Sequence, residues 1–237
     1  MPSDVERLSD WIRAHVAEAG RVAAVVGLSG GIDSATVAAL AKRALGDEVY
    51  GVIMPCESDP ADAEDAKIAA EALGVSYRVV DLGPAFQVLR EQLALPPNMP
   101  RLAIANLKPR LRMITLYAEA AWRNALVLGT GNRSELEIGY FTKYGDGGVD
   151  LLPIGSFLKH EVRALARELG VHARIIDRQP SAGLWEGQTD ESEMGMTYQE
   201  LDAYLASGEG SPLVAGLVET MRSQSAHKRS LPPIFPR

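Results

Sequence analysis

Short apolar runs and stretches with helical periodicity alternate along the first half of the chain. Apolar residues between Val5 and Val16 recur at intervals of three and four positions, which predicts an amphipathic opening helix that ends near Gly20. The apolar run 22–28 predicts a first strand, and a glycine turn then leads into a helix that stops at Gly46. The chain therefore begins with helix, strand, turn and helix.

The same order of elements follows a second time. We expect a strand at 49–54, an alanine-rich helix at 61–73 that Gly74 stops, a third strand at 76–80 and a helix from Ala85. The strands are continuously apolar, which is typical of a parallel sheet covered on both faces. The predicted fold class is α/β, with a doubly wound, mainly parallel sheet and helices on both faces.

The second half of the chain carries further elements and two loop segments. After a proline-rich break at 93–100, the sequence predicts a helix at 110–123, a buried strand at 125–129, a glycine-rich loop at 139–148 and a helix at 159–169. The segment 180–195 combines turn formers with polar residues, so we expect a mobile loop of functional length, with 183–195 as a lid.

Composition limits the classes of function. The 237 residues, 46% of them hydrophobic, are enough for one substantial core, so we expect residues 1–237 to form one domain. A net charge of −7 argues against a nucleic-acid partner, and any phosphate-bearing ligand must bind to local groups. Cys56 is the only cysteine, and the sequence shows neither a secretory stretch nor a membrane-spanning run, so we expect a cytoplasmic protein.

The glycine turn after the first strand carries the candidate chemistry. Gly30 and Gly31 let the backbone turn its N–H groups toward one point, and Ser29 and Ser34 add hydroxyl groups, which together form an anion cradle at a helix N-terminus. Neither a Walker A lysine nor the third glycine of a Rossmann turn is present. Asp33 beside bound phosphate requires a divalent cation between them, unless it only caps the helix.

A serine hydrolase is an alternative interpretation of the same turn. Gly27, Ser29 and Gly31 form the G-x-S-x-G pattern of a nucleophile elbow, and Asp150 and His160 follow in the order of hydrolase triads. The elbow would lie on an early strand, however, with no room before it for the usual oxyanion loop. We therefore favour a nucleotide-binding turn.

The motif S-G-G-x-D-S at 29–34 resembles the signature of the pyrophosphate-loop ATP pyrophosphatases, which implies an adenine nucleotide α-hydrolase-like fold. Further matches lie at 106–118, 129–150, 151–170 and 180–195 and in the HKR sequence that ends at Arg229. Together they run from Leu28 to Arg229 and resemble the ammonia-dependent NAD synthetase family. Two positions depart from it, because Ser181 replaces a usual threonine and Gly183 a usual acidic residue.

The resemblance implies a set of site residues. It assigns ATP to Gly27, Leu28, Ser29, Gly30, Gly31, Ile32, Asp33, Ser34, Met54, Thr130, Lys159 and Ser181. It assigns deamido-NAD to Arg110, Lys143, Asp150, His227 and Lys228. Asp33 and Glu135 are the expected magnesium ligands, and Asp33 and Lys159 the expected catalytic residues.

The resemblance also implies a reaction. ATP adenylates the nicotinate carboxylate of deamido-NAD and releases pyrophosphate, and ammonia then displaces AMP to give NAD. Glutamine-dependent relatives carry an additional amidohydrolase domain, so free ammonia is the expected nitrogen donor, with Mg²⁺ as cofactor, ATP as co-substrate and a homodimer as assembly. An inactive nucleotide-binding relative with the same fold is the remaining alternative.

Overall fold

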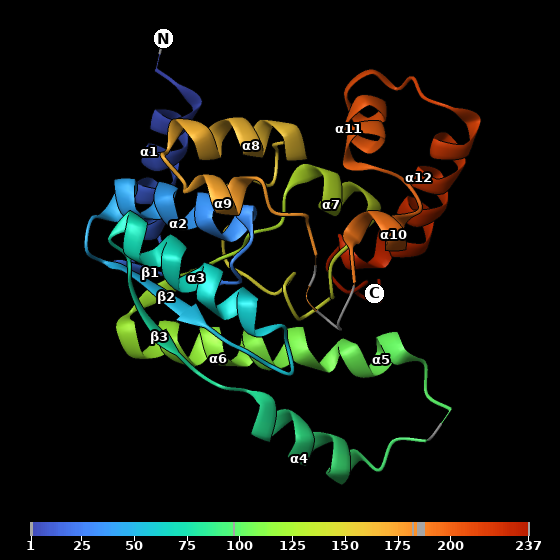
Figure 1. Ribbon diagram of the computed structural model, residues 1–237, viewed down its shortest axis with the longest axis horizontal. Helices are drawn as coiled ribbons and strands as arrows, with labels where there is room; N and C mark the ends of the chain where they lie inside the picture. The colour runs from blue at the N-terminus through green and yellow to red at the C-terminus, as the bar shows by residue number, and fades with distance from the viewer. Residues whose placement is uncertain (1, 97, 182, 184–187, 237) are drawn as a thin grey trace.

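Four parallel strands form the centre of the computed structural model, which describes residues 2–96, 98–181, 183 and 188–236 (Figure 1). The strands are β1 (Ala23–Leu28), β2 (Val49–Ile53), β3 (Ser76–Val79) and β4 (Ala125–Leu128). Their spatial order is β3-β2-β1-β4, and Val26 of β1 lies opposite both Gly51 of β2 and Leu128 of β4. The order reverses between β1 and β4, and such a switch point is where open α/β sheets bind ligands.

Helices cover both faces of this sheet, which confirms the predicted doubly wound α/β class (Figure 1). The helices of the first half are α1 (Asp4–Glu18), α2 (Ile32–Leu45), α3 (Pro60–Leu73), α4 (Gly83–Leu93), α5 (Arg101–Ala105) and α6 (Leu107–Arg123). Ala24, Val26 and Leu28 of β1 pack against α1 to α3, whereas Ala23 and Val25 pack on the side of α4 and α6. Both faces of β1 are therefore apolar.

The remaining helices follow β4. They are α7 (Arg133–Ile138), α8 (Lys159–Glu168), α9 (Ala173–Ile176), α10 (Asp190–Met194), α11 (Tyr198–Ser207), α12 (Pro212–Ser225) and the 3-10 turn η1 (Ala226–Lys228). Helix α8 joins the core next to α1 and α2, whereas α7 and α10 to α12 share a separate apolar cluster that includes Ile138, Tyr198 and Leu201. Figure 1 shows this C-terminal group beside one end of the sheet.

Most predicted elements are present with ends that differ by a few residues. The first strand begins at Ala23 because Val22 is exposed, and the predicted helix at 110–123 begins at Leu107. The expectation of a loop throughout 180–195 is wrong over α10, where Thr189 caps a short helix. Residues 182 and 184–187 of that segment lie outside the described residues.

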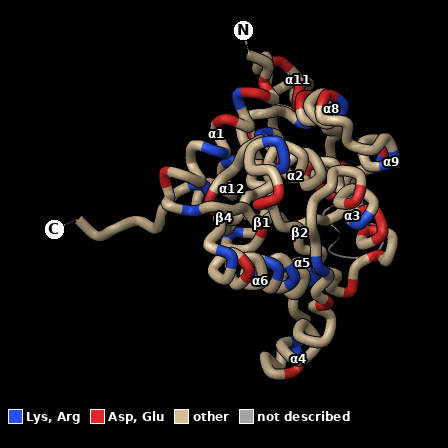
Figure 2. Tube along the Cα trace, turned by 90° about the vertical axis from the view of Figure 1, so that its left-hand side faces the viewer, with Lys and Arg blue, Asp and Glu red and all other residues tan. Residues whose placement is uncertain are grey.

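In the described part of the chain, no helix combines the length and apolar character that a membrane crossing requires. The chain ends in an extended segment that leaves the body of the protein (Figure 2). Its apolar side chains Leu231, Ile234 and Phe235 are exposed.

Candidate active site

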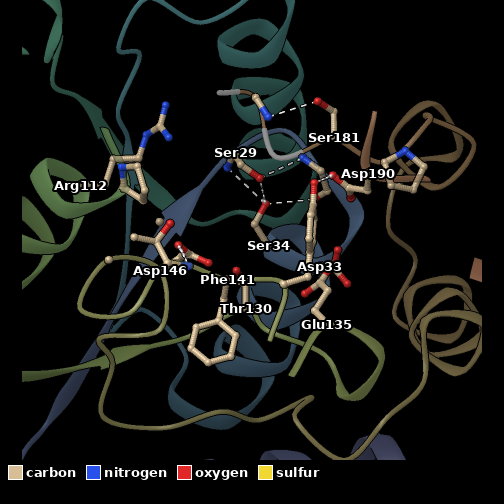
Figure 3. Close-up of a pocket in the computed structure, with 18 of the residues that line it drawn as sticks. Ser29, Asp33, Ser34, Arg112, Thr130, Glu135, Phe141, Asp146, Ser181 and Asp190 are labelled. Carbon is tan, nitrogen blue, oxygen red and sulfur yellow. Dashed lines mark hydrogen bonds between the residues drawn. The ribbon is translucent and has the colours of Figure 1, made fainter. Parts of the chain in front are cut away.

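A cavity of about 690 Å³ opens at the carboxyl ends of β1 and β4 (Figure 3). Its wall includes residues from the glycine turn, from the turn after β2, from α6, from the loop 139–149, from 178–181 and from Gly183. Most of the residues expected to bind ATP line it, namely Gly27, Leu28, Ser29, Gly31, Ile32, Asp33, Ser34, Met54, Thr130, Lys159 and Ser181. The switch point of the sheet and the glycine turn thus meet in one cavity.

The glycine turn is fixed by its own serines and by close packing against α3. The Ser34 hydroxyl donates to the carbonyl of Gly31 at 2.9 Å and accepts from the backbone N–H of Ser29 at 3.2 Å. Gly30 has a φ of 80°, and a Cβ there would lie 2.4 Å from the carbonyl oxygen of Asp62. Only glycine satisfies both conditions. Gly31 offers α2 no side-chain cap, so the helix N-terminus keeps its N–H donors for an anion in the cavity.

Asp33 in the first turn of α2 meets two side chains from distant parts of the sequence. The Lys159 Nζ atom lies 2.5 Å from Asp33 Oδ2 and 3.3 Å from Glu135 Oε1. Burial by itself would lower the pKa of Lys159, but the two carboxylates offset this effect and raise it. Lys159 is therefore a buried ammonium ion that bridges the two carboxylates expected to bind a metal.

Asn132 is a residue of the site that the resemblance did not supply. Its side-chain oxygen accepts from the N–H of Glu135 at 3.0 Å, and the Glu135 carboxylate accepts from the Asn132 N–H, which forms a capping box at the start of α7. The amide of Asn132 also donates to Asp33 at 3.1 Å. The capping pattern N-x-x-E is visible in the sequence, but its link to Asp33 is not.

Two tyrosines connect these carboxylates to α10, where Asp190 lines the cavity. Tyr198 Oη donates to Asp190 at 3.0 Å and to Glu135 at 3.2 Å, and Tyr140 Oη donates to Asp190 at 3.2 Å. Burial raises the pKa of Glu135, of Asp190 and of both tyrosines. Figure 3 shows Asp33, Glu135 and Asp190 on one side of the cavity and Arg112 on the other.

The donor atoms suit a cation that a ligand helps to bind. Among the described residues, no three or more His, Cys, Asp or Glu side chains are arranged to hold a metal ion by themselves. Mg²⁺ in nucleotide sites commonly takes one or two carboxylates and completes its shell with phosphate oxygens and water. Asp33 and Glu135 already converge on a positive charge, that of Lys159. The pair therefore fits a magnesium ion that arrives with a phosphate.

Basic residues of α6 have local partners in the turn after β2. Arg112 donates to the carbonyl of Met54 at 3.2 Å and to the Ser58 hydroxyl at 3.0 Å, and Lys108 donates to the carbonyl of Glu57 at 3.2 Å. Both side chains thus hold the wall of the cavity next to Met54. In the described structure Arg112 and Lys108 therefore bind protein atoms.

The residues expected to contact deamido-NAD are divided between the cavity and the outer surface. Of the five, Lys228 is the one that lines the cavity, where it donates to the carbonyls of Gly139 and Phe141 at 2.8 and 2.7 Å. Lys143 donates to the carbonyl of His227, and the exposed Arg110 lies beside it.

Asp150, the last of these five residues, is engaged with the fold itself. Its carboxylate accepts from the N–H of Val127 at 2.8 Å and from Tyr117 Oη at 3.0 Å. This contact supports the end of β4 and raises the pKa of Tyr117 to about 12, with burial as the larger cause. Asp150 therefore binds groups of the protein itself, and it is not among the described residues that line the cavity.

The segment that leads into the expected lid is tied to α3. Arg178 pairs with the carboxylates of Asp62 and Asp65, and the pair with Asp65 measures 2.8 Å. Gly183 has a φ of 60°, and its N–H donates to the Ser181 hydroxyl at 3.1 Å. No local pattern in the sequence indicated Arg178, because its partners lie more than a hundred residues earlier.

The serine hydrolase alternative receives no support. Ser29 interacts with Ser34, whereas His160 pairs with the Asp202 carboxylate at 2.8 Å and Asp150 with backbone and tyrosine groups. The three proposed members of a triad therefore have other partners, and no nucleophile is activated.

Comparison with known proteins agrees with this geometry. A family model described as NAD synthase matches residues 4–232. The NH(3)-dependent NAD(+) synthetase of Carboxydothermus hydrogenoformans is 54% identical over 97% of this chain and 95% of its own length. Among solved structures, the NMN synthetase of Francisella tularensis matches with a TM-score of 0.92 and 36% identity, covering 98% of this chain and 97% of its own.

An NH3-dependent NAD synthetase of Campylobacter jejuni matches with a TM-score of 0.81 and 32% identity over 98% of this chain and 97% of its own. The range matched by the family model, 4–232, includes all the residues that line the cavity. The chain belongs to the NAD synthase family.

Proposed function

We infer that the chain is an ammonia-dependent NAD synthetase, a ligase that uses ATP to amidate deamido-NAD and releases AMP and pyrophosphate. The observation that carries this inference is the convergence of Asp33, Glu135 and Lys159 beside the glycine turn. That arrangement supports a phosphate cradle, a cation site and a lysine in one cavity, as adenylation of a carboxylate requires. The near full-length relatives named NH(3)-dependent NAD(+) synthetase support the choice of substrate and nitrogen donor.

The first half-reaction must bring the nicotinate carboxylate onto the α-phosphate of ATP, although both groups are anionic. We propose that the backbone of 29–34 and the N-terminus of α2 hold the phosphates, and that Lys159 turns toward them when they enter. Its ammonium ion then neutralises charge on the departing pyrophosphate. In the free protein, Asp33 and Glu135 keep this lysine protonated and inside the cavity.

The second half-reaction requires a cavity that admits ammonia and excludes water. Arg178 anchors residues 178–181 to α3 on one side, and α10 contributes Asp190 on the other. We propose that the segment 183–195, the lid expected from the sequence, closes over the adenylate and protects it from hydrolysis. Residues 184–187 of this proposed lid lie outside the described residues.

We propose Mg²⁺ as the cofactor, with Asp33 and Glu135 as its protein ligands. When bound, the ion held by these carboxylates would neutralise the negative charge that develops during adenylation. Asn132 holds both carboxylates in place, since it bonds to Asp33 and caps the helix of Glu135.

We propose a homodimer as the assembly, because some residues assigned to deamido-NAD lie outside the cavity of one chain. Arg110, Lys143 and His227 lie together on the surface, beyond the cavity that one chain encloses. On α6, Leu107, Leu111 and Tyr117 pack on the sheet side, so the exposed Ile114 and Trp122 are the apolar residues left for a partner. We propose that a second copy covers these two side chains.

We also propose that residues 1–237 form one domain in each copy. The proposed location of the enzyme is the cytoplasm.

The reaction is tested with deamido-NAD, ATP, Mg²⁺ and ammonium. We expect NAD, AMP and pyrophosphate in equal amounts, with a rate that rises with pH as free ammonia forms. Glutamine in ammonia-free buffer should support little synthesis. Production of ADP and phosphate, or equal rates with both nitrogen donors, would contradict the proposed reaction.

Amidation of the mononucleotide is a second candidate, because the NMN synthetase of Francisella tularensis superposes so closely. The same assay distinguishes the two when nicotinate mononucleotide replaces deamido-NAD. We expect the higher kcat/KM with deamido-NAD. A preference for the mononucleotide would keep the adenylation chemistry but change the substrate.

Arg110→Ala tests the assignment of the outer surface. Arg110 is exposed and contacts the loop of Lys143, away from the ATP cavity. We expect the KM for deamido-NAD to rise about tenfold or more, as for loss of one charge-assisted contact, while the KM for ATP stays near its original value. Equal changes for both substrates would show that Arg110 does not distinguish them.

A further inference from the structure

Helix α8 presents the catalytic lysine from its first turn, where the Glu161 carboxylate accepts the N–H of Leu158 at 2.7 Å. The residue at the N-cap position is Leu158, which has no polar side-chain atom to accept a backbone N–H. The first N–H groups of a helix have no partner within the helix, and α8 begins at the buried residues Leu158 and Lys159, followed by the exposed His160. An acceptor for the buried N–H of Lys159 must therefore come from another part of the chain.

Two side chains from other helices accept N–H groups of this first turn. The N–H of Lys159 donates to Ser134 Oγ at 3.0 Å, and the N–H of His160 donates to Asp202 Oδ2 at 2.9 Å. The Ser134 hydroxyl in turn donates to Asp202 Oδ1 at 2.5 Å. Asp202 is thus bonded to the start of α8 directly and through Ser134, the neighbour of Glu135 on α7.

The environment of Asp202 makes these bonds strong. The side chain is buried, and the ring of His160 adds a third contact at 2.8 Å. A carboxylate at a helix N-terminus also gains from the helix dipole. One turn earlier on the same face of α11, Tyr198 contacts Glu135 and lies over the Lys159 ammonium. Helix α11 therefore touches the catalytic groups at one position and their supports at the other.

We propose that Asp202 is a positioning residue, which serves as the missing N-cap of α8 and, with Ser134, fixes Lys159 relative to Glu135. Asp202 does not line the cavity, so it acts through Ser134 and the first turn of α8 and not on substrate. The inference rests on the proposed role of Lys159 in adenylation. It also explains why a helix far from the sheet bears a buried carboxylate.

Asp202→Asn tests this role because it keeps the size of the side chain but removes its charge and one acceptor. We expect folded protein in which single-turnover pyrophosphate release slows by about tenfold to a hundredfold, as small misplacements of a catalytic group commonly do. The KM values for ATP and deamido-NAD should change by about twofold or less, since no binding contact is removed. Ser134→Ala, which breaks the link from Asp202 to the Lys159 N–H, should slow the same step.

Thr197→Ala is the matched control on the same helix. Thr197 caps α11 at the exposed surface through Glu200, so its loss destabilises the helix without touching Ser134 or α8. Its midpoint of thermal unfolding should fall while the rate of pyrophosphate release, measured well below that temperature, stays at the wild-type value. If Asp202→Asn and Ser134→Ala behave like Thr197→Ala, Asp202 only stabilises the fold, and our inference is wrong.

Lys159→Met, measured in the same assay, separates this inference from the proposed function on which it depends. If Lys159→Met releases pyrophosphate at the wild-type rate, the catalytic role of Lys159 fails and the positioning role fails with it. If Lys159→Met is inactive, adding Asp202→Asn should cause little further loss, because the residue that Asp202 positions is already absent. Should Asp202→Asn prove unfolded, the comparison of Ser134→Ala with Thr197→Ala decides the question.

Discussion

Replacing Lys159 with methionine is expected to stop adenylation almost completely and to raise the affinity of the nucleotide-free protein for Mn²⁺. Loss of one charged contact to a phosphoryl-transfer transition state commonly costs a hundredfold or more, on the order of 3 kcal/mol. The second effect follows from geometry, because the Lys159 ammonium lies between Asp33 and Glu135 where a divalent cation would bind. Without it, the two partly buried carboxylates lose the positive charge that they share.

The size of the gain in metal affinity can be bounded. Two unit charges about 4 Å apart at an effective dielectric constant of 20 interact by about 4 kcal/mol, whereas a tenfold change in affinity requires about 1.4 kcal/mol. We therefore expect Mn²⁺ to bind Lys159→Met at least about tenfold more tightly than the wild type in titrations without nucleotide. Mn²⁺ should also raise the thermal unfolding midpoint of the variant more than that of the wild type.

Lys67→Met is a matched control, since Lys67 forms an exposed pair with Glu64 on α3, away from the site. It should leave both activity and Mn²⁺ affinity unchanged. Equal Mn²⁺ affinity in Lys159→Met and wild type would mean that the ammonium does not compete with the metal. In that case Asp33 and Glu135 are partners of Lys159 alone.

Local signals were sufficient to predict the sheet and the glycine turn. The apolar strands and the Gly30–Gly31 turn depend on neighbours in sequence, and the structure places them as expected, with the φ of Gly30 in the left-handed region. The short helices were not predicted, because α9 and α10 contain too few residues for helical periodicity to show. Their ends depend on caps and on tertiary packing.

The site itself was only partly predictable. Family resemblance pointed to Asp33, Glu135 and Lys159, but that Lys159 bridges the other two is a property of the folded chain. Arg178 and Asp202 were not predicted, because each contacts residues that are distant in sequence. No sequence motif indicates a buried ion pair or a cap that another helix supplies. Such contacts arise from the packing of α3, α8 and α11 and cannot be seen in a single sequence.

Replacing Asp33 with asparagine is expected to give folded, nearly inactive protein, and the reason lies in how the carboxylate is held. Asn keeps the size of the side chain, and the α2 N-terminus depends on no cap from this position. The change removes the negative charge that faces Lys159 and the proposed magnesium ion. The rate of pyrophosphate release should fall by a hundredfold or more, on the scale seen when one electrostatic contribution to a transition state is lost.

Glu135→Gln should cause a similar loss, and the double variant decides whether the two residues serve one ion. If Asp33 and Glu135 bind the same magnesium, either change alone removes most of its effect, so the double variant should be far less impaired than the product of the two losses implies. The measurement is single-turnover pyrophosphate release across a magnesium titration, in which both single variants should need more metal for half-maximal rate. A multiplicative double variant with unchanged magnesium dependence would show that the two carboxylates act separately, as partners of Lys159 and of Tyr198 and not as ligands of one metal.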